Sequence, residues 1–321
     1  IKPLNMKRKK FIKLASTGAL GISSLGYLSC ENQKQIFFKL SLAQWSLNKQ
    51  IKSGETSPYL FAEIAKELGF TGLEYVNQLY DDVMLSQNKS SSIKNFISKS
   101  NQLALDNGME NVLIMIDHEG DLADENLDSR LKSVDNHKLW ADTAAEMGCS
   151  SIRVNLQGSK DKDKWKDLSM DSLYKLCQHA KEMNLNIVVE NHGELSSNIP
   201  VLMDVINGVD MSNCGTLPDF GNFCVAVEGY GSIFTGECAD VYDLYKGVEE
   251  MMPKAFAVSA KSNDFDTKGD EKTIDYKRML EIVNRFGYTG YIGVEYEGSR
   301  LSEIDGIKAT KDLLIKMGQS I

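Results

Sequence analysis

The sequence has few prolines and histidines, and it lacks the short motifs of several large enzyme classes. Only 5 of its 321 residues are Pro and 4 are His. It contains no P-loop, no GxSxG elbow, no HExxH helix and no GxGxxG turn after its first predicted strand. These absences argue against a P-loop NTPase, an α/β-hydrolase, a zincin and a dinucleotide-binding open sheet.

Cysteine is scarce and shows no motif. Beyond Cys30 there are five cysteines and no CxxC pair among them: Cys149, Cys177, Cys214, Cys224 and Cys238. This excludes a zinc ribbon and a thioredoxin-like motif. Because the number is odd and the spacing irregular, we expect buried free thiols, although an exported chain could form disulfides.

A basic surface is also missing. Residues 1–30 hold six of the 36 Lys and Arg residues and no acid, so residues 31–321 carry 30 basic against 45 acidic side chains. A protein that binds a phosphate backbone needs a basic face. Nucleic acid is therefore not an expected partner. The remaining composition, 42% hydrophobic and 25% charged, is that of a globular domain.

The N-terminal segment has the pattern of an export signal. After Met6 come four basic residues, Lys7 to Lys10, then a mostly apolar stretch from Phe11 to Leu28, then Ser29 and Cys30. This predicts that residues 1–30 are upstream residues plus a signal peptide, and that the protein is exported to the periplasm or its membrane.

Two features refine this prediction. Leu25 to Cys30 resembles a bacterial lipobox, which predicts a lipid anchor at Cys30 as the single membrane contact; simple cleavage is the alternative. Arg8 to Lys13 resembles a twin-arginine signal with its second Arg replaced by Lys, and a Sec signal is the alternative. We expect residues 31–38 to be a linker and residues 39–321 to form the catalytic domain.

Short β-branched runs alternate with longer runs of helical period in that domain. The predicted strands are Lys39–Leu47, Gly72–Asn77, Asn111–Asp117, Ser151–Leu156, Asn186–Glu190, Cys214–Asp219, Ala255–Ala260 and Tyr291–Glu295. The predicted helices are Tyr59–Leu68, Ile93–Asn107, Leu131–Met147, Asp171–Met183, Val201–Val209, Val241–Met251, Tyr276–Phe286 and Ile304–Met317.

The connections between these elements favour one α/β architecture. Turns from helix to strand are short and contain Gly, whereas loops from strand to helix are long, as in 118–129 and 221–240. Longer loops at one end of the sheet are typical of a (β/α)8 TIM barrel, whose active site is built from the loops at the C-terminal ends of its strands. We therefore predict a single-domain TIM barrel, with a doubly wound open sheet as the alternative.

Three carboxylates end predicted strands at this same edge: Glu190, Asp219 and Glu295. Like charges held close together raise each other's pKa unless a cation lies among them. A divalent metal would supply that charge, and carboxylates suit Mg²⁺ or Mn²⁺. The alternative is that each acid pairs with Arg153, Lys261 or a backbone amide.

Several segments resemble one known superfamily. They are Val189–Gly193, Leu217–Phe223, Gly293–Gly298, His137–Trp140 and Ile152–Asn155. In this order and at these strand positions they resemble the xylose-isomerase-like barrels, a superfamily of sugar (phosphate) isomerases and epimerases. The resemblance covers nearly all of residues 39–317.

The resemblance implies one divalent ion held by Glu190, Asp219 and Glu295, with Mn²⁺ or Mg²⁺ favoured and Co²⁺ or Zn²⁺ as alternatives. The seventh strand departs from the family pattern. Where the family often has Val-His-x-Lys, this chain has Val258, Ser259, Ala260 and Lys261. A Ser hydroxyl is rarely a good ligand, so water, His192 or nothing would fill the fourth place.

The chemistry implied is proton transfer beside a sugar carbonyl through an enediolate. Glu190 and Glu295 would act as base and acid, and Lys261 would stabilise the oxyanion. Five further residues would contact substrate: His192, Trp45, Asn155, Asn222 and His118. The substrate would be a small sugar or oxidised glycoside. Export argues against a phosphorylated intracellular metabolite.

Two other functions stay open at this stage. A lyase or hydratase acting on 3-keto-glycosides would begin with the same proton abstraction. A sugar-binding lipoprotein without catalysis would account for Ser259. The sequence predicts no oligomeric state.

Overall fold

The computed structural model describes residues 35–226, 232–234 and 238–321. The predicted signal segment, with Cys30, and residues 31–34 of the predicted linker lie outside these ranges. Eight strands follow one another along the described chain: β1 (Lys39–Ala43), β2 (Gly72–Val76), β3 (Glu110–Met115), β4 (Ser151–Val154), β5 (Asn186–Glu190), β6 (Cys214–Leu217), β7 (Val258–Ser262) and β8 (Tyr291–Tyr296).

These strands form one sheet that curls into a barrel. The order is β6-β5-β4-β3-β2-β1-β8-β7, and each paired neighbour is parallel. Strands β6 and β7 meet only at isolated bridges, Thr216 with Ala255 and Asp219 with Ser259. The β6–β7 seam is thus the least regular junction of the barrel, and it lies within the carboxylate site described below.

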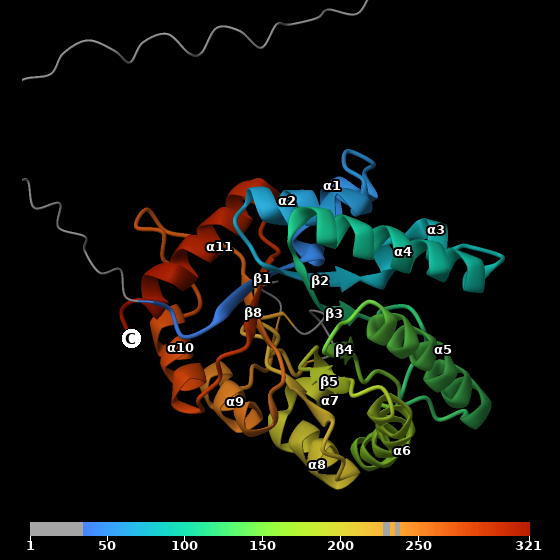
Figure 1. The fold of residues 1–321 in the computed structure, drawn as a ribbon. Helices are drawn as coiled ribbons and strands as arrows, with labels where there is room; N and C mark the ends of the chain where they lie inside the picture. Colours follow the sequence, from blue (N-terminus) through green and yellow to red (C-terminus); the bar gives the residue numbers. More distant parts are fainter. Residues whose placement is uncertain (1–34, 227–231, 235–237) are drawn as a thin grey trace, which may run out of the picture. The chain divides into compact units, whose positions relative to one another are not determined.

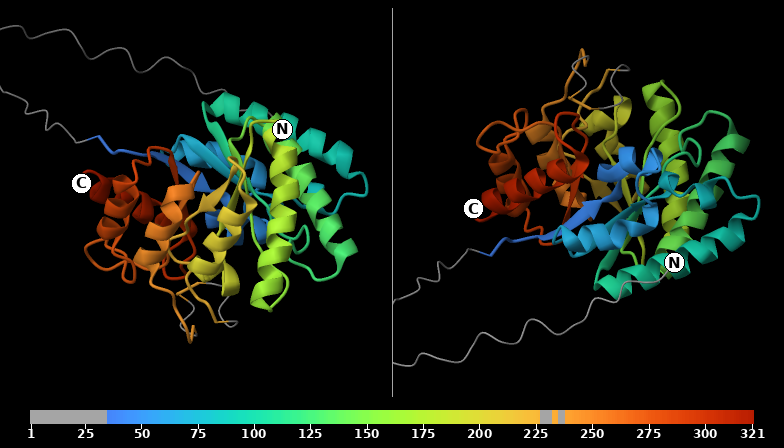
Figure 2. Two further views of the ribbon diagram at one scale, coloured as in Figure 1. Left: turned by 90° about the horizontal axis from the view of Figure 1, so that it is seen from below. Right: turned by 90° about the horizontal axis from the view of Figure 1, so that it is seen from above.

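The helices surround these strands (Figure 1), and two further views show them outside the sheet (Figure 2). The α-helices are α1 (Asn48–Lys52), α2 (Phe61–Glu67), α3 (Asp81–Met84), α4 (Lys89–Asn107), α5 (Leu127–Glu146), α6 (Lys162–Lys181), α7 (Glu194–Ser197), α8 (Ile199–Val209), α9 (Leu244–Met251), α10 (Tyr276–Arg285) and α11 (Glu303–Gly318). The 3₁₀ helices are η1 (Gln44–Leu47), η2 (Pro58–Leu60), η3 (Asn77–Leu79) and η4 (Met252–Lys254).

Capping side chains fix where the long helices begin. Asn126 accepts a hydrogen bond from the Ser129 amide before α5, and Asp161 accepts from the Lys164 amide before α6. Such caps stabilise a helix by about 1 kcal/mol each. They place the helix starts at the long loops that follow the C-terminal ends of the strands.

The core lies between sheet and helices. The strands are apolar runs buried on both faces, as expected of a parallel sheet; Ile187, Val188 and Val189 in β5 are fully buried. Phe38, in the predicted linker, is also buried. No helix within the described ranges combines the length and apolar character needed to cross a membrane.

The predicted (β/α)8 barrel is confirmed, and several of its details differ; the first predicted strand, for example, ends at Ala43 instead of Leu47. Strand β7 begins at Val258 instead of Ala255, because Met252 to Lys254 form η4 and delay the strand. The expectation of free thiols is correct for Cys149, Cys177 and Cys214 but wrong for the other pair, because Cys224 and Cys238 form a disulfide. The loop after β6 brings the two sulfurs together, which irregular spacing along the chain cannot show.

Candidate active site

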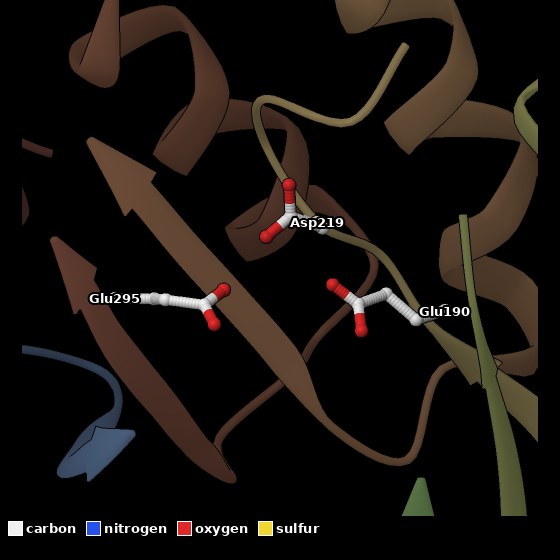
Figure 3. Close-up of side chains that lie close together, drawn as sticks. All are labelled: Glu190, Asp219 and Glu295. Atoms are coloured by element: carbon white, nitrogen blue, oxygen red, sulfur yellow. The ribbon is translucent and has the colours of Figure 1, made fainter. Parts of the chain in front are cut away.

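Three carboxylates converge at the C-terminal edge of the barrel. Glu190 is the last residue of β5, Asp219 follows β6, and Glu295 lies in β8. Each is at most 3% exposed. Their carboxylate oxygens lie within 4.8 Å of one another and point toward a common centre (Figure 3). The parallel direction of the strands explains this, since it brings all their C-terminal ends to one edge.

Backbone amides hold Asp219 in place. The Gly221 amide donates to its Oδ1 at 2.9 Å. The side chain of Asn191 accepts from the Asp219 amide at 2.8 Å and donates to the Asn222 carbonyl at 2.8 Å. The turn after β6 is therefore tied to the end of β5, which fixes Asp219 beside Glu190.

Ser259 of β7 lies between two of these acids, Asp219 and Glu295. Its hydroxyl lies 2.7 Å from Asp219 Oδ2 and 3.1 Å from Glu295 Oε2. Among the residues that the structure describes, the group of close ligand atoms contains no histidine, so His192 does not provide a fourth ligand in this arrangement. The candidate metal-ligand atoms, from the three carboxylates and the Ser259 hydroxyl, are therefore all oxygens.

Two buried cations flank the carboxylates. Arg153 of β4 forms ion pairs with Glu190 at 2.9 Å and with Asp117 at 2.8 Å. Lys261 of β7 lies 3.6 Å from Glu295 and 3.4 Å from Glu297.

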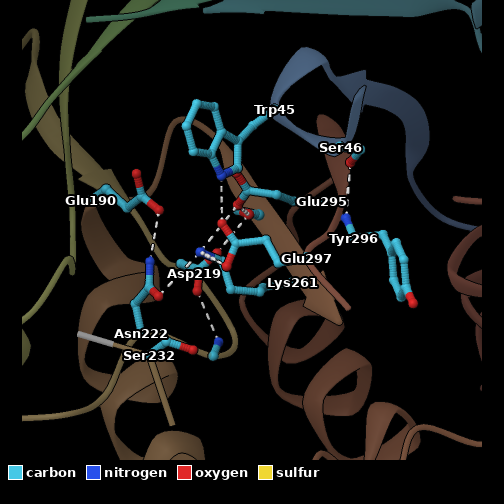
Figure 4. Close-up of polar contacts among 12 residues, drawn as sticks. Trp45, Ser46, Glu190, Asp219, Asn222, Ser232, Lys261, Glu295, Tyr296 and Glu297 are labelled. Atoms are coloured by element: carbon cyan, nitrogen blue, oxygen red, sulfur yellow. Dashed lines mark hydrogen bonds and ion pairs between the residues drawn. The ribbon is translucent and has the colours of Figure 1, made fainter. Parts of the chain in front are cut away.

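Asn222 joins the two halves of this network (Figure 4). Its Nδ2 donates to Glu190 at 3.0 Å, and its Oδ1 accepts from Lys261 at 3.1 Å. Lys261 and Glu190 are therefore connected through the side chain of Asn222, so a movement of Lys261 would alter the hydrogen bond to Glu190.

The proton affinities of these groups diverge. Burial raises the pKa of Glu190, Asp219 and Glu295, and this effect outweighs the nearby cations. Burial would also raise the pKa of Asp117, but Arg153 reverses the effect and lowers it to about 2. In the same way, Lys261 and then His192 overcome burial and lower the pKa of Glu297.

The residues at the centre fit a divalent cation. Within the described ranges, five buried or partly buried carboxylates, Asp117, Glu190, Asp219, Glu295 and Glu297, face two paired cations, Arg153 and Lys261. The pairing alternative is realised in part, because each acid of the trio has a cation or an amide beside it. The excess negative charge remains, and an all-oxygen donor set suits a hard divalent ion.

A polar cavity of about 570 Å³ opens above this centre. Glu190, Glu295 and Lys261 reach its wall, whereas Asp219 is fully buried behind it. The five side chains predicted to contact substrate all line the cavity: Trp45, His118, Asn155, His192 and Asn222.

Four of these five side chains have hydrogen-bond partners, and those of Asn222 are Glu190 and Lys261. The Trp45 indole donates to Glu297 at 2.7 Å, and Asn155 donates to Asp117 at 3.0 Å. His118 is exposed, and its ring lies 3.0 Å from the Gln78 amide oxygen. All three line the cavity; Trp45 and Asn155 are half-buried, whereas His118 is exposed to solvent.

The sequence argument assigned no role to Glu297 or Asp117, and both line the cavity. Glu297 could have been found, because residues two apart in a strand project to the same face, and it follows Glu295 by two. Asp117 ends a predicted strand, but its pairing with Arg153 depends on the register of β3 against β4.

Comparison with known proteins agrees with this geometry. A family model described as xylose isomerase-like TIM barrel matches residues 62–317. No curated protein sequence matches the chain.

Solved structures share the fold at low sequence identity. An IolI protein with a bound zinc atom has 14% identity and a TM-score of 0.63, over 88% of this chain and 99% of its own. The 3-keto-D-glucoside 4-epimerase YcjR of E. coli has 14% identity and a TM-score of 0.62, over 87% and 99%.

A xylose isomerase-like TIM barrel protein of Mycobacterium smegmatis, in complex with magnesium, has 15% identity and a TM-score of 0.60, over 88% of this chain and 97% of its own. The family match spans most of the chain, and it coincides with a barrel that carries three carboxylates at the C-terminal edge of its strands. The chain belongs to the xylose isomerase-like TIM barrel family.

Proposed function

We propose that this protein is a divalent-metal-dependent sugar isomerase or epimerase that moves a proton next to a carbonyl group. One observation carries the proposal: three buried carboxylates lie within 4.8 Å of one another at the inner end of a polar cavity. Glu190, Asp219 and Glu295 would hold the ion. Structural relatives that carry zinc and magnesium support this assignment.

Glu190 and Glu295 are the candidates for proton transfer. They come from β5 and β8 and reach the cavity from different sides, so a sugar carbon between them would have a carboxylate toward each face. One group would remove the carbon-bound proton and the other would return a proton. Their raised pKa values bring both carboxyls nearer to neutral pH, where a carboxyl exchanges protons most effectively.

Lys261 would stabilise the negative charge of the enediolate. Its ammonium group lies between Glu295, Glu297 and Asn222 and lines the cavity. A bound divalent ion would supply Lewis acidity to the carbonyl and hydroxyl oxygens of the substrate. Trp45 and Glu297, joined by a hydrogen bond, would border the sugar and restrict its position.

The cavity favours a neutral sugar over a sugar phosphate. Its two buried cations, Arg153 and Lys261, are already paired with carboxylates. A phosphate group placed there would have to displace one of these pairs. We therefore propose an unphosphorylated sugar or oxidised glycoside as the substrate class.

Export and a lipid anchor at Cys30 remain part of the proposal. The supporting features are the basic and apolar N-terminal pattern and the disulfide between Cys224 and Cys238. Disulfides persist chiefly in oxidising compartments such as the periplasm.

Elemental analysis of the purified protein tests the proposal. We expect about one divalent ion per chain in the wild type and loss of this ion in Glu190→Gln and Glu295→Gln. Glu119→Gln is the matched control, because Glu119 lines the same cavity but lies outside the carboxylate trio. Absence of any ion after incubation with Mn²⁺, Mg²⁺, Co²⁺ and Zn²⁺ would exclude the metal mechanism.

The type of reaction is read from solvent deuterium. Incorporation of deuterium into a keto-sugar without loss of a group indicates an isomerase or epimerase. Cleavage of the glycosidic bond indicates the lyase. Sugar binding that is unchanged in Glu190→Gln, with no exchange in the wild type, indicates the binding lipoprotein.

A further inference from the structure

A second cavity of about 370 Å³ lies directly beside the first. Gln157 and His192 belong to the walls of both cavities, so the two spaces meet at these side chains. The walls of the second cavity come from the loops after β3 and β4, from α6, and from α7 with the segment that precedes it. It therefore opens on the same edge of the barrel as the carboxylate site.

The side chains at the junction are available for a ligand. Within the part of the chain that the structure describes, the Gln157 amide and the His192 ring form no hydrogen bond. Most polar groups deeper in the first cavity are paired, among them Asn222 and Glu297. A polar side chain that lines two cavities and has no partner can bind a hydroxyl or ether oxygen that extends from one space to the other.

The second cavity also offers apolar surface. The Trp165 ring borders the cavity but adds little of this surface, because the residue is only 2% exposed and its Nε1 donates to the Leu156 carbonyl at 3.1 Å. Leu195 of α7 is half-buried beside it in the wall. Apolar surface next to unpartnered hydroxyl-binding groups is what a sugar ring requires, since its faces are C–H surfaces and its rim is hydroxyl groups.

The charge of this wall excludes a strongly anionic occupant. Lys160 is its one cation among the described lining residues, and it is paired with Glu194. Asp121 adds a further negative charge. A phosphate or nucleotide group would meet two carboxylates and no free cation, whereas a neutral sugar unit would meet no such penalty.

We propose that the substrate is a glycoside that occupies both cavities. This inference rests on the proposed function and deepens it: the ring that reacts lies above Glu190 and Glu295, and the attached sugar unit lies in the second cavity. Gln157 and His192 bind near the glycosidic oxygen that joins the two units. The protein then selects a disaccharide-like glycoside over a single free sugar.

Equilibrium binding tests this selection without turnover. The probes are methyl hexosides of gluco, galacto and manno configuration and their matching α- and β-linked methyl dihexosides, in which no carbonyl is available. Calorimetry on the metal-loaded wild type is expected to show at least one dihexoside binding about tenfold more tightly than its matching hexoside.

Leu195→Trp places a larger side chain in the second cavity and is expected to remove this tenfold advantage. Leu105→Trp is the matched control, because Leu105 is 75% exposed on α4 and lines neither cavity. Melting temperatures of both variants show whether they are folded, and the comparison of probes in the wild type needs no variant at all.

Equal affinity for hexosides and dihexosides in the wild type would overturn the inference and leave the proposed function intact. So would an equal weakening of both probes by Leu195→Trp. If no probe binds although the metal still does, the sugar assignment itself is overturned together with the second site, and the metal centre alone remains.

Discussion

At the scale of single residues, Ser259 decides the character of the metal centre. Its hydroxyl lies between Asp219 and Glu295, at the place where the family pattern has a histidine. With oxygen donors alone, the site has no preference for the softer ions that imidazole favours.

Ser259→His is therefore expected to raise the affinity for Zn²⁺ or Co²⁺ by about tenfold or more relative to Mg²⁺. Calorimetric titration of the metal-free protein measures this ratio. Ser259→Ala is the control, since it removes the hydroxyl without adding a ligand, and its Zn²⁺ to Mg²⁺ ratio should match the wild type. A ratio unchanged in Ser259→His would mean that the imidazole does not reach the ion.

Glu74 is a second residue with a measurable consequence. It is buried in β2, accepts a hydrogen bond from Ser41 at 2.5 Å, and packs so closely on Gly293 that a Cβ there would collide with its carboxylate. Burial raises its pKa to about 8, and the charges of Glu295 and Glu190 add to the effect.

A folded-state pKa above the unfolded value stabilises the protein at low pH, and this stability is lost as pH rises through the folded value. For Glu74 the loss extends from about pH 4.5 to about pH 8 and amounts to roughly 5 kcal/mol. Glu74→Gln should flatten the dependence of unfolding free energy on pH in this window and increase stability at pH 8. Denaturant titrations of the metal-free protein at several pH values measure this free energy of unfolding. Glu63→Gln is the control, because Glu63 is exposed. A pH profile unaltered in Glu74→Gln would contradict the assignment.

At the scale of elements, the disulfide joins two points within the segment between β6 and α9. Cys224 and Cys238 are 14 residues apart, and Phe234 between them lines the main cavity. A disulfide that closes a loop of this length stabilises a fold by about 3 kcal/mol, because it lowers the conformational entropy of the unfolded chain.

The double variant Cys224→Ser/Cys238→Ser should therefore have a free energy of unfolding about 3 kcal/mol lower than that of the wild type. It should accordingly unfold at a lower denaturant concentration. A reductant should lower the stability of the wild type and leave the double variant unchanged. Cys149→Ser serves as the control for placing a hydroxyl in a buried thiol position. Equal sensitivity of wild type and double variant to reductant would show that the bond does not stabilise the fold.

The strands were predictable to a greater extent than the helix starts. Buried parallel strands are continuous apolar runs, and β5 is observed exactly as predicted, at Asn186–Glu190. Helix α6 begins at Lys162 instead of the predicted Asp171, because its first turns are charged and hide the apolar period. The capping residue Asp161 was the local signal that marks its start.

The same distinction holds for the site. Glu190, Asp219 and Glu295 could be placed together from the sequence, since strand direction alone brings them to one edge. The contact of Ser259 with two of them, the bridging role of Asn222 and the second cavity could not, because they depend on side-chain conformation and on how separate loops pack.

At the scale of the whole molecule, the site lies across the least regular junction of the barrel. At the β6–β7 seam, the Phe256 amide donates to the Thr216 carbonyl at 3.1 Å and the Ser259 amide to the Pro218 carbonyl at 3.0 Å. The other neighbouring strands pair as ladders, which are continuous except for a register shift at Leu73 and Glu74 between β2 and β3. Of the three carboxylates, Glu190 and Asp219 stand on one side of the seam and Glu295 on the other.

A metal ion held by these carboxylates would therefore link the two edges of the sheet. Because it binds the folded state alone, it should stabilise the fold by an amount that grows with the logarithm of its concentration. Addition of Mn²⁺ should raise the melting temperature and slow hydrogen exchange at the Phe256 and Ser259 amides more than at amides between β2 and β3. Asp219→Asn should abolish both effects while it keeps the shape of the side chain. Uniform protection of all strands would instead mean that the ion stabilises the barrel as a whole and that the seam is as firmly closed as every other junction.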